Sequence, residues 1–167
     1  LHSPYTLSLH DALPIFQGAS RWCEVTDSPK SFSTLSSHLM IESPAFAAAA
    51  AAISSIMVMR REEFSVLLAD ELYTFARRTL RGLESEHREG RLLATTILCL
   101  YCSALGKTVE GQSTLHECAE LLQAHSLQNA PHRLLTACFW VFARQGTASC
   151  HLCKPILTYQ KISGQAI

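Results

Sequence analysis

The chain lacks the short motifs that mark the commonest catalytic and nucleotide-binding sites. Neither a G-x-x-x-x-G-K-[ST] nor a G-x-G-x-x-G phosphate-binding loop occurs in its 167 residues. There is no H-E-x-x-H pair of zinc ligands, and Ser55, Ser103 and Ser113 do not stand in the G-x-S-x-G turn of a hydrolase nucleophile. We therefore expect no enzyme, and no catalytic or cofactor-binding residues.

An excess of charge of one sign is also missing, as is a long uninterrupted apolar run. Fourteen Lys and Arg balance fourteen Asp and Glu, so no overall field attracts nucleic acid or an anionic membrane. The apolar stretch 45–59 is interrupted by Ser54 and Ser55 and followed by Arg60 and Arg61. It is shorter than the roughly 18 to 20 residues that cross a bilayer. It therefore predicts a buried core helix, and no secretory leader pattern precedes it.

Cysteine is present in an odd number, mostly in apolar stretches where a thiol packs as a small hydrophobe. The seven are Cys23, Cys99, Cys102, Cys118, Cys138, Cys150 and Cys153. This usage favours a reducing compartment.

The spacing of Cys150 and Cys153 is that of half a zinc site or of a redox couple. Zinc needs two further ligands, and no second close pair lies in a predicted loop. Cys99 and Cys102 fall inside an apolar helix, where we expect them to pack inward. Core packing is favoured over metal binding, so no metal ligands are expected.

Histidine, arginine and aromatic clusters have similarly ordinary interpretations. The eight histidines do not converge, which favours surface or capping roles over metal binding; they are His2, His10, His38, His87, His116, His125, His132 and His151. A basic strip that could meet nucleic acid is interleaved with Asp70, Glu71 and Glu84, which favours a solvated face; it comprises Arg60, Arg61, Arg77, Arg78 and Arg81. Phe139, Trp140 and Phe142 predict core packing rather than a ligand pocket.

Apolar residues recur at helical spacing and no alternating strand pattern occurs, which predicts an all-α fold. About six helices are expected, packed as antiparallel neighbours through short loops. The first ends before Pro44, which suits the first turn of the alanine-rich helix, with Ser43 as its N-cap. The expected helices cover 35–40, 44–59, 62–83, 92–101, 114–125 and 134–144.

Two of these helices carry detailed expectations. In 62–83 the apolar stripe includes Leu67, Leu72 and Phe75, so this face should lie on the core, opposite a polar face. Gly106 to Gly111 reads as a loop, followed by a T-x-x-E capping box formed by Thr114 and Glu117.

The ends of the chain differ in character from its middle. Thr6 to Ile15, TLSLHDALPI, resembles one reading frame of a widely used sequencing-library adapter. Residues 1–16 are therefore expected to be non-native, and His10 and Asp11 to belong to no site. A Ser- and Thr-rich linker over 17–34, a helical domain over 35–158 and a tail over 159–167 complete the predicted organisation.

The order of the helical signatures resembles the fungal-specific transcription factor domain, the helical regulatory region of fungal binuclear zinc-cluster transcription factors. The opening LMIESPAF and the alanine run resemble the start of that domain. LHECAELL and CFWVFARQ resemble two of its later helices, and the resemblance covers about 35–157. Gly146 stands where the family usually has an acidic residue.

This resemblance implies a partial nuclear regulator of RNA polymerase II transcription that contacts protein partners, itself or a small-molecule effector. The family's DNA-binding element, six cysteines that hold two zinc ions, is absent from this sequence. The fragment is therefore expected to bind neither DNA nor membranes directly. Two alternatives remain: a generic helical scaffold, which no repeat period supports, and a small helical enzyme or redox protein that uses Cys150 and Cys153.

Overall fold

The computed structural model describes residues 38–62, 66–82, 88–126 and 133–146. Within these ranges the chain is helical and contains no strand, which confirms the all-α class. A short helical segment, 38–42, precedes the five helices α3 (Pro44–Glu62), α4 (Val66–Gly82), α5 (Arg88–Ala104), α6 (Thr108–Ser126) and α7 (Arg133–Gly146). The antiparallel arrangement stays a prediction.

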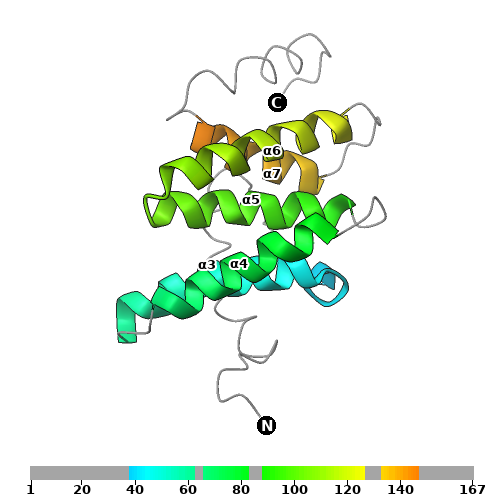
Figure 1. Ribbon diagram of the computed structural model, residues 1–167. Helices are drawn as coiled ribbons and strands as arrows, with labels where there is room; N and C mark the ends of the chain where they lie inside the picture. Colours follow the sequence, from blue (N-terminus) through cyan, green and yellow to red (C-terminus); the bar gives the residue numbers. More distant parts are fainter. Residues whose placement is uncertain (1–37, 63–65, 83–87, 127–132, 147–167) are drawn as a thin grey trace.

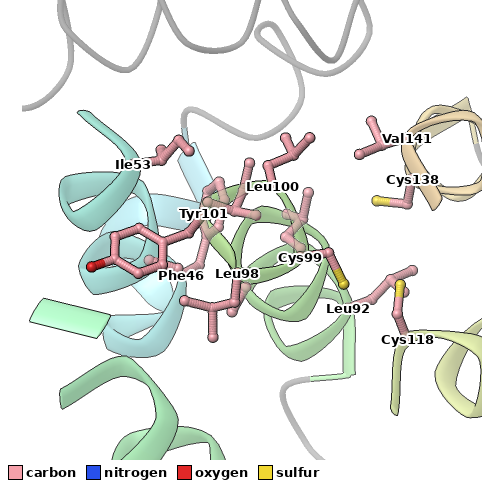
Figure 2. Packing of buried hydrophobic residues seen from close by; sticks show 14 of the residues in the cluster. Phe46, Ile53, Leu92, Leu98, Cys99, Leu100, Tyr101, Cys118, Cys138 and Val141 are labelled. Carbon is pink, nitrogen blue, oxygen red and sulfur yellow. The ribbon is translucent and has the colours of Figure 1, made fainter. Parts of the chain in front are cut away.

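Helix α5 is the centre of the molecule. Figure 1 shows α3 and α4 on one side of it and α6 and α7 on the other. All residues from Leu92 to Cys102 are buried, as a helix that is apolar around its circumference requires. In Figure 2, Phe46 and Ile53 approach α5 from one side, whereas Cys118, Cys138 and Val141 approach it from the other. The prediction of a central helix over 92–101 is confirmed.

The break before α3 follows the predicted chemistry. Ser43 is buried and non-helical, and its hydroxyl accepts a hydrogen bond from the Phe46 N–H at 3.3 Å. This is an N-cap, and Pro44 occupies the first helical position, where its missing N–H costs nothing. Both predictions are confirmed.

Ser43 also lies so close to the start of α5 that it leaves no room for a side chain at position 90. A Cβ added to Gly90 would lie 2.5 Å from Ser43 Oγ and 2.7 Å from Ser43 Cβ. Glycine at position 90 therefore permits a close approach of the α5 start to the α3 cap.

The predicted start of α6 is wrong. Gly106, with φ of 66°, ends α5, and the Lys107 N–H donates to the Cys102 carbonyl at 2.9 Å. This Schellman-type end leaves only a short turn before α6 begins at Thr108. Thr114 therefore lies inside the helix, where its hydroxyl donates to the Glu110 carbonyl at 2.7 Å. It forms no capping box with Glu117.

The expected burial of α4 is only partly correct. Ala69, Ala76 and Leu80 are buried against the core. Leu67 is 74% exposed and Phe75 is 52% exposed, although both belong to the predicted apolar stripe. Because α4 packs mainly on α3 and little on α5, the core covers a narrower sector of this helix than the pattern suggests.

Candidate functional site

A group of polar side chains joins α4 to the turn between α5 and α6. Asp70 of α4 accepts a hydrogen bond from the Tyr101 hydroxyl at 2.7 Å and another from the Lys107 ammonium. The rings of Tyr73 and Tyr101 stack with their centroids 4.9 Å apart. Lys107 Nζ lies 5.4 Å from the centroid of the Tyr73 ring and 5.7 Å from that of Tyr101. These contacts form one cluster in which a cation is held by a carboxylate and two ring faces.

The protonation of this cluster is fixed by its surroundings. The hydrogen bond from Lys107, and then that from Tyr101, lowers the pKa of Asp70 below its ordinary value. Burial raises the pKa of Tyr73 to about 12, and the neighbouring Cys102 thiol adds to this shift. Burial, with the hydrogen bond to Asp70, also raises the pKa of Tyr101. At neutral pH the site holds an ionised carboxylate beside two neutral phenols.

A second polar contact ties α4 to α5 and α6 through one carboxylate. Glu117 of α6 binds Arg77 of α4 at 2.8 Å and Arg91 of α5 at 3.4 Å. The Arg77 and Glu117 side chains are 20% and 24% exposed, so water screens their pairing incompletely. The backbones of α4 and α6 make few contacts with each other. The ion pair between Arg77 and Glu117 therefore connects these two helices through their side chains.

A hollow of about 280 Å³ lies beside the first cluster, at the junction of α5, α6 and α7. This volume is just below the range for ligand pockets, about 300 to 1,000 Å³. Its lining combines buried thiols, amides and one cation: Cys99, Cys102, Ser103, Gly106, Lys107, Thr108, Gly111, Gln112, Leu115 and Gln145.

The thiols at this hollow are in a protonated, unreactive state. Cys99 shares a hydrogen bond with Cys118, which together with burial raises the pKa of Cys99. Burial also raises the pKa of Cys102, whose thiol donates to the Tyr73 hydroxyl at 3.7 Å. Because the thiolate is the reactive species, neither group is an activated nucleophile. In Figure 2, Cys99 and Cys118 face each other between α5 and α6.

The cysteines follow the sequence prediction where the structure describes them. Cys99, Cys102, Cys118 and Cys138 are buried thiols, so the expected inward packing is confirmed. No group of three or more metal-ligating side chains occurs among the described residues. The C-x-x-C pair at 150 and 153, together with Cys23, lies outside them.

The remaining candidates are distributed over core and surface. The Ser55 and Ser103 hydroxyls donate to carbonyls one turn earlier in their own helices, at 2.8 Å and 3.0 Å. His38 is exposed, and His116 is exposed beside Glu120. The side chains of the other histidines are not among those that the structure describes. Phe139 and Phe142 are buried, as expected of core residues.

The predicted basic strip divides in the structure. Arg78 and Arg81 are exposed, but Arg77 is half-buried in its ion pair with Glu117. The side chains of Arg60 and Arg61 lie outside those described. The expectation of a uniformly solvated arginine face is therefore wrong at Arg77.

Sequence reasoning missed the cluster around Asp70. Asp70 and Lys107 are 37 positions apart, and each taken alone resembles a solvated charge. The one available signal was Tyr101 at the end of an apolar run, because a buried tyrosine hydroxyl usually requires a hydrogen-bond partner.

No family model matches the chain, and no curated protein or solved structure is significantly similar to it. The part of the chain that the structure describes contains no helix long and apolar enough to cross a membrane.

Proposed function

We propose that the chain is a regulatory, protein-contacting helical domain of a fungal zinc-cluster transcription factor. The observation that supports this proposal is that the three sequence signatures of the resemblance meet in one core. Phe46 of the first, Cys118 of the second and Phe142 of the third are each at most 1% exposed, and their helices all contact α5. Signatures that form a common core describe a folding unit rather than a reactive centre.

The chemistry of the polar cluster agrees with a binding role. Its thiols are protonated, its phenols are neutral, and its carboxylate and ammonium already neutralise each other. Such groups can orient a partner or a small effector at the adjoining hollow, but they offer no activated nucleophile. The proposal includes a nuclear location, protein partners of the transcription machinery or a small-molecule effector.

Contact with DNA is assigned to a separate element of the transcription factor. The chain has zero formal net charge, and Arg77 of its arginine cluster is paired with Glu117. A phosphate-binding surface would require unpaired cations in excess. In a gel-shift titration we expect no sequence-specific complex of the isolated chain with duplex DNA.

A reporter assay tests the regulatory role. The full chain is fused to an unrelated DNA-binding domain in a fungal cell that carries the matching reporter gene. We expect the fusion to change transcription relative to the DNA-binding domain alone. Phe142→Ala, which disrupts the core, should remove this change, whereas Glu120→Arg on the exposed face of α6 should retain it.

The result that contradicts the proposal is equally specific. A stably expressed, folded fusion whose reporter output equals that of the DNA-binding domain alone excludes a regulatory domain. It would favour the generic helical scaffold instead. A fluorescent fusion of the complete gene product that stays outside the nucleus would argue the same way.

A further inference from the structure

The outer face of α4 carries apolar and charged side chains in an order that is complementary to itself. Phe75 is 52% exposed at the middle of this face. Glu71 precedes it by four residues and Arg78 follows it by three, and all three are exposed. Residues three, four and seven apart lie on one side of a helix. The face therefore runs from acid through aromatic to base.

A two-fold axis turns this order into a matching pair. When two copies of α4 lie antiparallel, with the axis between Thr74 and Phe75, Glu71 lies opposite the partner's Arg78. By symmetry Arg78 lies opposite the partner's Glu71, and the two Phe75 rings meet near the axis. Isologous contacts of this kind require one patch that complements itself.

The ends of the face fit the same register. In this pairing Leu67 lies opposite the partner's Gly82. A Cβ added to Gly82 would meet nothing within 4 Å, so the surface at this glycine has space for another side chain. The partner's Leu67, which is 74% exposed in the single chain, can dock there. A face built for an unrelated basic or acidic partner would carry charge of one sign.

We propose that the chain forms a two-fold symmetric homodimer through the outer face of α4, with Phe75 at its centre and reciprocal pairs between Glu71 and Arg78. One helix face is smaller than the standard protein interface, so the dimer is weak. Its dissociation constant is expected between about 1 μM and about 1 mM. This dimer does not depend on the transcriptional role and applies equally to a scaffold protein.

Sedimentation equilibrium of the full chain in reducing buffer measures the association. The weight-average mass should rise with concentration from 18.4 kDa toward twice that value. A mass that stays at 18.4 kDa up to about 1 mM overturns the proposal. In that case another protein or another segment of this chain covers the face.

Charge-reversal variants distinguish a second copy of this chain from any other protein that could bind the outer face of α4. Glu71→Arg alone and Arg78→Glu alone each place like charges opposite one another, and each should weaken the dimer at least about tenfold. The double variant restores opposite charges and should dimerise like the original chain. An equimolar mixture of the two single variants should also associate, because each supplies the charges that the other needs.

Two further variants complete the test. Phe75→Ala should weaken association without altering the helical circular dichroism spectrum, because this side chain is half exposed. Glu120→Arg makes the same charge change as Glu71→Arg on the exposed face of α6 and should leave the dimer unchanged. If the double variant remains as weak as the singles, or if Glu120→Arg weakens the dimer equally, the assigned interface is wrong.

Discussion

The layers on the two sides of α5 are packed with side chains of different size. On one side, α3 contributes mainly alanine, and Ala45, Ala49, Ala50 and Ala52 are completely buried. On the other side, α6 and α7 contribute cysteine, leucine and phenylalanine. Small side chains allow helices to approach closely, whereas large ones fill a wider gap. The two layers should therefore fail in opposite ways when side-chain volume is changed.

The largest expected loss of stability follows from removing side-chain volume in the layer formed by α6 and α7. Phe142→Ala removes a side chain that is 1% exposed in α7. Truncation of a buried phenylalanine costs about 3 to 5 kcal/mol, because apolar contacts are lost and a cavity remains. Urea unfolding followed by circular dichroism measures this loss of unfolding free energy. A loss below about 1 kcal/mol would mean that α7 does not belong to the core.

The alanine layer should be sensitive to added volume. Ala49→Leu places a larger side chain where none of the alanine surface is exposed. Overpacking of this kind costs about 1 to 3 kcal/mol, because neighbouring helices must move apart. Ala124→Leu, at an exposed position of α6, is the matched control and should change the unfolding free energy little. Equal effects of the two substitutions would refute close packing in α3.

A smaller effect is expected where α5 approaches the α3 cap. Gly90→Ala puts a Cβ within 2.5 Å of Ser43 Oγ, which displaces the serine from its N-cap contact with Phe46. Alanine also favours the helix by about 1 kcal/mol, so we expect a net destabilisation of about 1 kcal/mol. Gly82→Ala, with nothing near the added Cβ, should be neutral or stabilising. If Gly90→Ala were more stabilising than Gly82→Ala, the close approach would be wrong.

The smallest effect concerns alkaline pH. The pKa of Tyr73 is raised to about 12 from the ordinary 10.0. The folded state holds the Tyr73 proton more tightly than the unfolded state does, and this difference stabilises the folded state. The contribution is complete below the pKa of the unfolded state and is lost as pH rises through the pKa of the folded state. Stability should therefore decline between pH 10 and about 12, and this decline should be shallower in Tyr73→Phe. Unfolding midpoints measured at several alkaline pH values test this; identical slopes would show that Tyr73 does not contribute.

The sequence predicted the parts of the fold that depend on local chemistry. The proline and serine at the start of α3, the largely apolar 92–102 segment of α5 and the aromatic α7 each follow from neighbouring residues in the chain. The Ser43 N-cap and the burial of residues 92–102 in α5 and of Phe139 and Phe142 in α7 confirm these predictions.

The predictions that failed depend on contacts between distant segments. Thr114 and Glu117 match a capping box, but the α5 end at Gly106 lets α6 begin six residues earlier at Thr108. Gly111 lies inside that helix, and a Cβ added there would lie 3.4 Å from Cys102 Cβ, which is an ordinary contact distance between α6 and α5. Nothing in the local pattern reports this packing of α6 on α5.

The candidate site was harder to predict than the fold for the same reason. Asp70 and Lys107 meet only because α4 passes the turn after α5, and their pairing leaves no trace at either position in a single sequence. The exposure of Phe75 likewise depends on how much of α4 the core covers.

Hydrogen exchange measured by mass spectrometry tests most directly whether α5 is the shared core of both layers. Exchange protection reports the free energy of opening, which is highest in the elements that unfold last. We expect peptides from α5 to exchange most slowly, at a rate set by global unfolding, and peptides from α4 to exchange faster. If peptides from α5 exchanged faster than peptides from α4, a core centred on α5 would be contradicted.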